Sequence, residues 1–425
     1  MAAGLFAVDA RMPEPPTTSV WMNEFRRPAG VPAPTVNPQT PHKVELGARL
    51  FRDVRLSGNG TISCATCHDP KLGFADGIRK SAAGTTRRAL RRHTPTLWNL
   101  AWVPALFWDG RSGSLEEQVW GPITHPDEMA SAPEVVTRAL AKDKDYLGLT
   151  RLAFPGETQL TPELIAQALA AYERTLVSPP TRFDAWIAGD PTALSDEQQH
   201  GFALFVGKAG CVTCHSGFAF TDHGFHDIGL PSDDMGRGEV TGIDRVRHAF
   251  KTPTLRELSW TAPYMHDGSM DTLEDVIRHY ESGGTVRASR SPDMPKALSL
   301  TDTERAALIV FLESLSSDRP PVPSTEAWIG HPLPKVAPAP SQTLLIGQLG
   351  KAFTPASVKV RLGKALTILN DDTRTHNVRI ADRRWNFNSG AQDPGESVVI
   401  KLDHLGLFEA HCAIHPTMRL SIEVE

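Results

Sequence analysis

The sequence has few cysteines, no long run of apolar residues and no concentration of charge of one sign. Only five cysteines occur among 425 residues, and the patterns around them, described next, leave no thiol for a disulfide. No stretch approaches the roughly 20 apolar residues that a membrane-spanning helix needs. The 44 basic and 49 acidic residues form neither a basic stripe nor a long block of like charge, so nucleic acid is not an expected partner.

Four of the five cysteines lie in two copies of the pattern C-x-x-C-H, which is the attachment signature of c-type haem. Thioether bonds join the cysteines to the porphyrin, and the adjacent histidine becomes the proximal iron ligand. A zinc half-site is the alternative, but it would need two further ligand pairs nearby. We therefore predict two covalently bound haem c groups. The two copies are Cys64-Ala65-Thr66-Cys67-His68 and Cys211-Val212-Thr213-Cys214-His215.

The fifth cysteine, Cys412, is followed by His415 and Met418, and a further imidazole, His376, lies upstream. Two imidazoles, a thiolate and a weak axial thioether are the ligands of a blue copper site. These four residues therefore predict one type 1 copper. We expect the side chain of His411 to point to the opposite face of its strand. The alternative is a plain β-sandwich with a buried free cysteine.

The pattern of residues divides the chain into regions of different character. Proline-rich residues 1–40 lack periodicity and predict an extended arm, after which helical signals begin. Thr161 before a proline, and capping boxes at Ser195 and Thr301, predict helix starts. Beyond a linker with seven prolines the pattern changes to period two, with strands predicted at 358–362, 377–380, 397–402 and 420–424.

We therefore predict a multidomain protein, in which a mostly-α dihaem cytochrome c type region precedes an all-β cupredoxin, a Greek-key β-sandwich. The predicted regions are an arm at 1–40, a first haem domain at 41–193, a second haem domain at 194–318, a proline-rich linker at 319–340 and a copper domain at 341–425. The family resemblance described next implies that the first haem domain is peroxidatic and that the second transfers electrons.

Residues around the haem motifs closely resemble the dihaem family of bacterial cytochrome c peroxidases and MauG, over roughly residues 40–320. The C-terminal region is similar to small cupredoxins, and its short Cys-x-x-His-x-x-Met loop is most similar to that of amicyanin. In that comparison Asn377 matches a residue that stiffens the copper site. The segments that carry the dihaem resemblance are Phe107-Trp108-Asp109-Gly110-Arg111, Leu115-Glu116-Glu117-Gln118, Gly121-Pro122-Ile123, Glu128-Met129, Lys251-Thr252-Pro253-Thr254-Leu255-Arg256, Ala262-Pro263-Tyr264-Met265-His266-Asp267-Gly268-Ser269, Leu273-Glu274-Asp275-Val276 and His279-Tyr280.

The resemblance implies a role for several residues. The haem of His68 would react with peroxide, assisted by Glu128 as a general acid and base, with Gln118 and Pro122 beside it. Trp108 would relay oxidising equivalents between the haems. The distal ligand of the haem on His215 would be Tyr280, as in MauG-type members, whereas most peroxidases of the family have methionine there. Met265 and Met270 are the substitutes if Tyr280 does not bind.

Two departures from the family pattern concern ligands. No histidine occurs between His68 and His93, so the blocking loop histidine of many relatives is absent, and we expect a five-coordinate or water-bound first haem. The family's calcium site uses an asparagine where this chain has His93, together with backbone oxygens matching Thr261 and Pro263. Because calcium prefers oxygen ligands, calcium is a doubtful cofactor here.

The resemblance implies an oxidoreductase that reduces hydrogen peroxide through high-valent haem, with electrons from the fused copper domain. The alternatives are a MauG-like enzyme that oxidises a protein substrate and a non-catalytic electron-transfer protein. The sequence does not identify the external electron donor or protein substrate, and a homodimer is one option for its assembly. Haem attachment implies the periplasm; Met1–Ala10 lacks a basic region, so we expect a targeting segment in the natural precursor.

Overall fold

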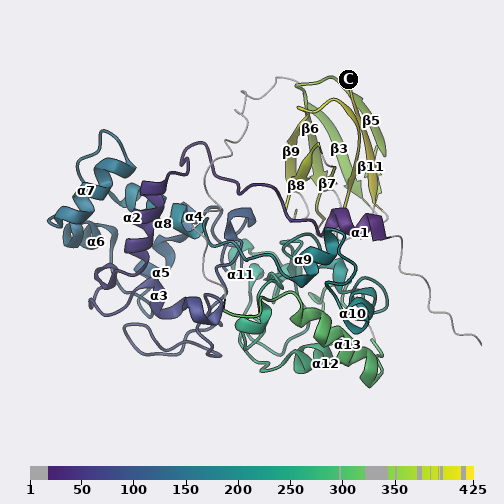
Figure 1. Ribbon diagram of the computed structural model, residues 1–425, viewed down its shortest axis with the longest axis horizontal. Helices are drawn as coiled ribbons and strands as arrows, with labels where there is room; N and C mark the ends of the chain where they lie inside the picture. The colour runs from purple at the N-terminus through teal and green to yellow at the C-terminus, as the bar shows by residue number, and fades with distance from the viewer. Residues whose placement is uncertain are drawn as a thin grey trace, which may run out of the picture.

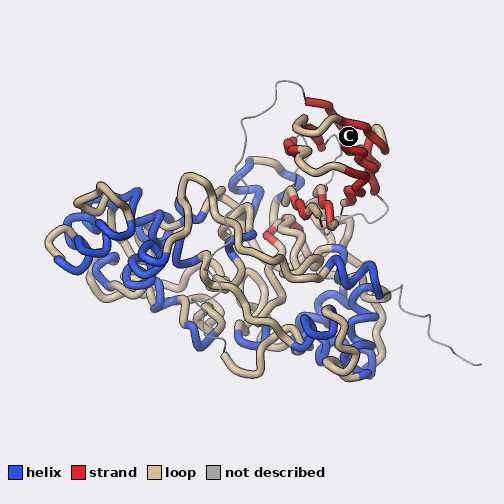
Figure 2. The backbone as a smooth tube through the Cα atoms, turned by 45° about the horizontal axis from the view of Figure 1, so that its top comes forward, coloured by secondary structure: helices blue, strands red, loops and turns tan. Residues whose placement is uncertain are grey.

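The computed structural model describes residues 18–295, 298–320, 343–349, 352–370, 376–382, 384–390, 392, 396–412 and 418–425. Two helical regions rich in loops are followed by a β-sandwich (Figure 1), and most strand residues lie in that last region (Figure 2). The predicted order, mostly-α and then all-β, is confirmed. The helices are α1 Thr18–Glu24, α2 Pro41–Phe51, α3 Cys64–Cys67, α4 Leu115–Gln118, α5 Trp120–Thr124, α6 Pro133–Leu140, α7 Lys144–Ala153, α8 Pro162–Glu173, α9 Arg182–Ile187, α10 Asp196–Val206, α11 Arg237–Thr241, α12 Leu273–Ser282 and α13 Asp302–Glu313.

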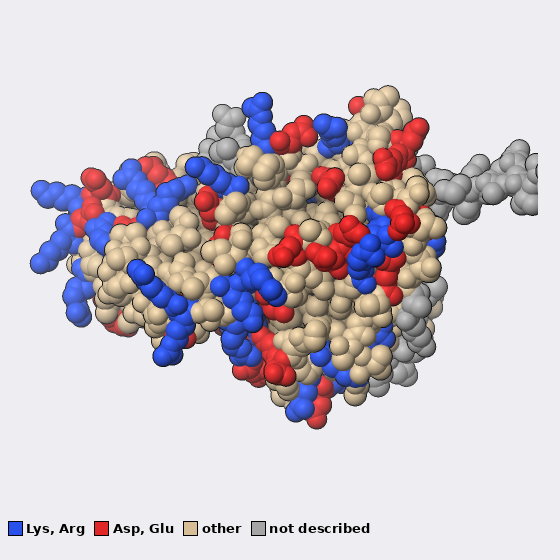
Figure 3. All heavy atoms as spheres, turned by 90° about the horizontal axis from the view of Figure 1, so that it is seen from below, with Lys and Arg blue, Asp and Glu red and all other residues tan. Residues whose placement is uncertain are grey.

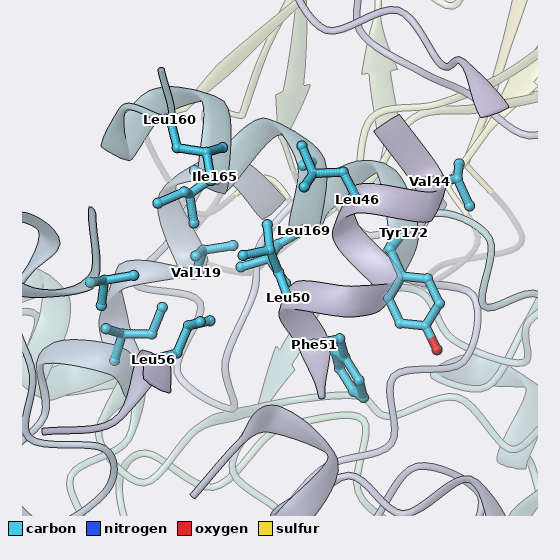
Figure 4. Close-up of a cluster of buried hydrophobic side chains, with 14 of the residues drawn as sticks. Val44, Leu46, Leu50, Phe51, Leu56, Val119, Leu160, Ile165, Leu169 and Tyr172 are labelled. Atoms are coloured by element: carbon cyan, nitrogen blue, oxygen red, sulfur yellow. The ribbon is translucent and has the colours of Figure 1, made fainter. Parts of the chain in front are cut away.

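The first helical region is built on the crossing of α2 and α8. Apolar side chains of both helices, among them Leu50 and Leu169, form one buried cluster (Figure 4). The helices approach closely at Gly47, where an added Cβ would lie 1.9 Å from the Ala168 carbonyl oxygen. Thr161 caps α8 by accepting a hydrogen bond from a backbone amide, as the sequence predicts. This helix pair supports the loops that carry the first cysteine pair.

The second helical region repeats this arrangement with α10 and α13. An added Cβ at Gly201 would lie 2.0 Å from the Ala307 carbonyl oxygen. The predicted capping boxes at Ser195 and Thr301 are both present. The core of this region is rich in aromatic rings, with Phe183, Phe202 and Phe311 among its buried members. Each helical region therefore has its own core around one close helix crossing.

Helix α1 corrects one expectation from the sequence. The predicted extended arm over residues 1–40 is wrong here, because residues 18–24 form a helix. Trp21 packs edge-on against Phe202, and Phe25 lies 4.7 Å from Phe220 between ring centroids. These aromatic contacts explain the helix, since burial in the second core compensates for the lack of periodicity in so short a segment. Residues 1–17 lie outside the described part of the chain.

The C-terminal region is a sandwich of two sheets. The five-stranded sheet has the order β5-β11-β10-β7-β8, and the four-stranded sheet has the order β4-β3-β6-β9. Alternate residues of the strands point into a shared apolar core, and the four strands expected from the period-two pattern are present. Residues 321–342, which include most of the predicted linker, lie outside the described residues. The strands are β3 Thr343–Leu349, β4 Ala352–Thr354, β5 Ser357–Val360, β6 Ala365–Asn370, β7 Arg379–Ala381, β8 Asn386–Asn388, β9 Ser397–Lys401, β10 Gly406–His411 and β11 Arg419–Val424.

Charged side chains of both signs are interspersed over the face drawn in Figure 3. The described part of the chain contains no helix that is long and apolar enough to cross a membrane. A two-stranded antiparallel sheet of β1 Phe225–His226 and β2 Phe250–Lys251 joins loops of the second helical region. The parts of the molecule that follow the two C-x-x-C-H motifs are therefore mostly loops held between helices.

Candidate functional site

The first cysteine pair lies in the short helix α3, and a backbone carbonyl orients the histidine that follows it. His68 Nδ1 lies 2.8 Å from the Phe74 carbonyl oxygen. Because a carbonyl oxygen only accepts, Nδ1 carries the proton, which leaves the lone pair of Nε2 for a metal. Burial lowers the pKa of His68, so the imidazole is neutral, as a metal ligand must be.

The second motif has the same local geometry. Cys211 begins a short 3-10 helix, and His215 Nδ1 lies 2.9 Å from the Phe220 carbonyl oxygen. Burial also lowers the pKa of His215. Both histidines of the predicted haem sites are therefore neutral, oriented and able to present Nε2 to an iron atom.

The four cysteines beside these histidines are free, partly buried thiols. Burial raises the pKa of Cys64 and of Cys211 to about 12 each, so neither is a reactive thiolate. Nearby, the buried His223 Nδ1 has no hydrogen-bond partner, and burial lowers the pKa of Lys251 to about 8. Covalently bound haem fits these residues, because it would convert the thiols to thioethers and its carboxylates would offer partners for buried nitrogen atoms.

The two regions share further details that the sequence analysis did not use. Thr96 Oγ1 donates to the Gly73 carbonyl at 2.6 Å, and Thr254 Oγ1 donates to the Ala219 carbonyl at the same distance. Both threonines belong to the tetrapeptide Thr-Pro-Thr-Leu, at 94–97 and 252–255. That repeated tetrapeptide is the signal by which the internal repeat could have been found.

Glu128 lies close to the first cysteine pair. Burial raises the pKa of Glu128, while His125 and Arg111 act in the opposite direction. Its Oε1 lies 3.8 Å from His125 Nδ1. The Glu128 carboxylate is also among the groups that raise the pKa of Cys67, which places it beside the first motif. A partly buried carboxyl group with a raised pKa is suited to exchanging a proton with a small substrate.

Gln118 and Pro122 lie on the short helices before Glu128. Gln118 ends α4, Pro122 lies within α5, and both side chains are half-buried. The Met129 amide donates to the Pro122 carbonyl at 3.2 Å, which ties α5 to the turn that carries Glu128. The structure therefore brings the three predicted residues into one segment of the first haem region.

Trp108 links the two helical regions. Its indole Nε1 donates to the His93 carbonyl at 2.9 Å, and its own carbonyl accepts from the Lys251 amide at 2.8 Å. His93 Nδ1 in turn lies 2.8 Å from the Ile78 carbonyl oxygen. Trp108 is thus hydrogen-bonded to segments of both helical regions, and its role as a relay stays a prediction. Calcium binding near His93 stays a prediction.

Tyr280 lies on α12, near the second cysteine pair. Burial is the largest cause that raises the pKa of the Tyr280 phenol, and its proximity to Cys214 and Cys211 acts in the same direction. The preceding residue, His279, donates from Nε2 to the Ile228 carbonyl oxygen, 2.8 Å away, so its proton lies on Nε2. The phenol is therefore directed to the second motif, while the neighbouring imidazole is engaged elsewhere.

Three of the four predicted copper ligands lie in described parts of the sandwich. Cys412 Sγ is buried, 3.7 Å from His376 Nδ1, and Met418 is also buried. With metal–sulfur and metal–nitrogen bonds of about 2.3 and 2.0 Å, two trigonal ligand atoms lie about 3.7 Å apart, so this pair fits a bound metal. The Asn377 amide also donates to Cys412 Sγ at 3.4 Å. His415 lies outside the described residues.

Sequence reasoning missed two buried charged groups near the second motif. His226 Nε2 lies 2.9 Å from Asp222 Oδ2, and both are close to Cys214. Glu24, at the end of α1, forms an ion pair with Arg379 of β7. Asp222 and His226 are only four residues apart, but they belong to no motif that the sequence analysis used. Glu24 and Arg379 come from opposite ends of the chain, so no local pattern could mark them.

Comparison with known proteins agrees with this arrangement. Residues 41–192 match the family described as di-haem cytochrome c peroxidase. The chain is 48% identical to the methylamine utilization protein MauG of Methylorubrum extorquens over 297 residues, which are 69% of this chain and 84% of that protein. The chain belongs to the di-haem cytochrome c peroxidase and MauG family.

Two further relatives support this membership. The cytochrome c551 peroxidase of Nitrosomonas europaea is 36% identical over 68% of this chain and 84% of its own length. The crystal structure of a MauG-like protein associated with microbial copper homeostasis is 30% identical, covers 76% of this chain and 99% of its own, and has a TM-score of 0.65. The predicted enzyme class, a cytochrome c peroxidase-like oxidoreductase, is thereby confirmed, and the family implies two haem c groups.

Proposed function

We propose that this protein is a periplasmic dihaem peroxidase that reduces hydrogen peroxide with electrons from its own type 1 copper domain. The observation that supports this most is the difference between the two motifs: the Glu128 carboxyl group lies beside the first and the Tyr280 phenol beside the second. Burial raises the pKa of Tyr280 above its usual value, so this phenol gives up its proton less readily than an exposed tyrosine. The carboxylate near the second motif, Asp222, is paired with His226, whereas the raised pKa of Glu128 suits proton exchange with peroxide in the first region.

In this proposal each haem is held by the two cysteines and the histidine of its motif, and Tyr280 is the further ligand in the second region. The haem of the first region supplies the iron at which the O–O bond of peroxide is reduced. The overall reaction takes one peroxide, two electrons and two protons to two waters. The protein must therefore control both the protons and the electrons.

Glu128 controls the protons. As a carboxylate it accepts the proton of one peroxide oxygen, and as a carboxylic acid it donates that proton to the other oxygen, which leaves as water. The raised pKa of Glu128, caused by burial against the opposing effect of His125 and Arg111, makes the protonated form easier to reach than in an exposed glutamate. Gln118 and Pro122 would border the same space, and Trp108 would relay charge to the second region.

The copper domain controls the electrons. His376, Cys412, His415 and Met418 would hold one copper ion, which supplies reversible one-electron chemistry. Two successive one-electron steps then complete each turnover. The predicted linker keeps the copper domain at high local concentration.

The test is peroxide turnover by Glu128→Gln, which keeps the shape of the side chain but removes its proton chemistry. We expect turnover to fall by about 10²- to 10⁴-fold, with the haem absorption spectra preserved. Asp127→Asn is the matched control, because Asp127 is the adjacent acid and its Oδ1 accepts from Thr86. Equal activity of the two variants would refute the role of Glu128.

A MauG-like activity, the oxidation of another protein, is the second candidate. Tyr280 beside the second motif and the 48% identity to a MauG protein favour it. When peroxide is added to protein with reduced copper, the thiolate-to-copper absorption should appear in step with peroxide loss if the copper is the donor. Consumption of peroxide with the copper still reduced would instead support the MauG-like activity, and no consumption would support an electron carrier.

A further inference from the structure

The β-sandwich contacts the haem-binding part of the chain through one buried carboxylate, Glu24. Arg379 Nη1 lies 3.0 Å from Glu24 Oε1, and both side chains are about nine-tenths buried, with 9% and 10% exposed. Arg379 Nη2 also donates to the Glu24 backbone carbonyl at 3.3 Å. His411 Nε2 lies 3.7 Å from Glu24 Oε2. Helix α1 is therefore joined to β7 and β10 by a charged contact from which water is largely excluded (Figure 1).

This contact is matched in charge. Burial raises the pKa of Glu24. Arg379, His411 and a hydrogen bond from the Gly217 amide together lower it by more than burial raises it, so the net pKa is below its ordinary value. Glu24 is therefore ionised at neutral pH and faces a guanidinium group. Separating the two partners of a buried ion pair leaves each charge buried without compensation, which costs free energy. The pair therefore favours one relative position of the joined segments.

On the sandwich side, the contact lies at the end that carries the predicted copper ligands. Arg379 follows His376 by three residues, and His411 directly precedes Cys412. His411 and Arg379 are direct partners in the pairing of β10 with β7. The groups that hold Glu24 are thus rigidly connected to two of the predicted copper ligands.

On the other side, the contact lies beside the second haem motif. Phe25, the residue after Glu24, packs on Phe220 with ring centroids 4.7 Å apart, and the Phe220 carbonyl accepts from His215 Nδ1. Gly217 follows His215 by two residues, and an added Cβ there would lie 2.5 Å from Arg379 Nη1. The carboxylate therefore connects the copper end of the sandwich to the segment that orients the second haem ligand.

A second point of close fit lies beside the first. An added Cβ at Gly390, in the loop after β8, would lie 2.6 Å from Pro104 Cγ. Trp102, two residues before Pro104, packs edge-on against Phe218 with ring centroids 4.9 Å apart. The sandwich is thus fitted at two places around the second motif, which a loosely tethered domain would not require.

We propose that Glu24 and Arg379 are positioning residues that dock the copper-binding end of the sandwich on the second haem motif, so that electrons enter the dihaem region there. This inference rests on the proposed function. In the transfer step copper(I) loses one electron and becomes copper(II), and the ferric iron of the second haem gains it and becomes ferrous. No bond forms or breaks, so geometry sets the rate of the step.

The experiment compares Arg379→Ala, Glu24→Ala and the double variant with the unaltered holoprotein. Hydrogen exchange of amides 21–25 reports docking, and the rate of electron transfer from copper(I) to the second haem after flash reduction reports its consequence. We expect faster exchange and a transfer rate lowered by about ten- to a hundredfold. The double variant should match the single ones, because both partners belong to one interaction.

Two variants keep the test decisive. Arg384→Ala removes an exposed arginine of the same sandwich, which pairs with Asp382 away from this contact, and should change neither quantity. Arg379→Lys keeps the charge but loses the planar fork, and should give an intermediate effect if Arg379→Ala does not fold. The thiolate-to-copper absorption should be unchanged in every variant, because no copper ligand is altered.

Unchanged exchange and transfer rate in Arg379→Ala would overturn the inference. Faster exchange with an unchanged transfer rate would also overturn it, since docking would then not position the copper. A complete lack of copper-to-haem transfer in the unaltered protein would instead refute the self-donor function. In that case the exchange measurement alone would still decide whether Glu24 and Arg379 dock the sandwich.

Discussion

The two haem-binding regions of this molecule share a frame, which consists of one close helix crossing and a carbonyl that orients the motif histidine. They differ in the groups that surround this frame. In both, a backbone carbonyl accepts from Nδ1 of the motif histidine, His68 or His215. In both, a glycine, Gly47 or Gly201, lets two long helices cross at the closest approach. The comparison shows that the geometry needed to hold a haem is repeated, whereas the groups that decide its chemistry are not.

The differences concern buried charge. In the first region Trp98 follows the Thr-Pro-Thr-Leu tetrapeptide and packs edge-on against Phe74. In the second region the equivalent position is Arg256, which is fully buried and forms two hydrogen bonds, of 2.7 and 2.8 Å, with Asp184. The second region thus holds a buried ion pair where the first has an aromatic ring.

The largest change in stability is expected when this pair is broken. Arg256→Met leaves the Asp184 carboxylate buried without its main partner and should lower the free energy of unfolding by about 3–5 kcal/mol. Chemical denaturation of the holoprotein measures the loss. Arg278→Met, which removes an exposed pair with Glu274, should cost less than about 1 kcal/mol. Similar losses in both variants would show that the buried pair has no special role.

The shared frame is tested by the two close helix crossings. Gly47→Ala and Gly201→Ala place a methyl group against the backbone of the facing helix, and each should lower the free energy of unfolding by about 1–3 kcal/mol. Gly148→Ala in α7 meets no atom within 4 Å and should raise that free energy by up to about 1 kcal/mol. If only one of the two crossing variants is destabilised, the frames are not equivalent.

A change in stability that depends on pH is expected from Glu173 in the first region. Burial, opposed by Arg174, raises the pKa of Glu173 from 4.5 to about 8. The folded protein therefore binds one more proton than the unfolded chain between these values, and stability falls with rising pH by up to about 1.4 kcal/mol per unit. Glu173→Gln should remove this slope, measured by denaturation from pH 5 to 8, and the exposed Glu134→Gln should retain it.

Much of this architecture follows from local signals in the sequence. The C-x-x-C-H motifs, the cap at Thr161 and the capping boxes at Ser195 and Thr301 each act over a few residues, so their structural consequences could be predicted. The period-two pattern located four of the nine strands in the described part of the sandwich for the same reason. The grouping of Glu128 with Gln118 and Pro122 was expected from a family resemblance rather than from such signals.

The features that the sequence analysis did not predict depend on contacts between distant segments. Helix α1 forms because aromatic residues such as Phe25 pack on the second core, 195 residues away at Phe220 by the numbering of the chain. The pair of Glu24 with Arg379 joins opposite ends of the sequence. The burial of Glu173 depends on helix packing. Periodicity and capping carry no information on these long-range partners.

Cyanide binding to the resting ferric holoprotein tests the central claim, that the first haem is open to substrate and the second is closed by Tyr280. Electron paramagnetic resonance reports the binding. The unaltered protein should bind one cyanide, at the iron held by His68. Tyr280→Phe should bind a second cyanide, and Glu128→Gln should still bind one. Two cyanides bound by the unaltered protein, or no gain in Tyr280→Phe, would contradict the account.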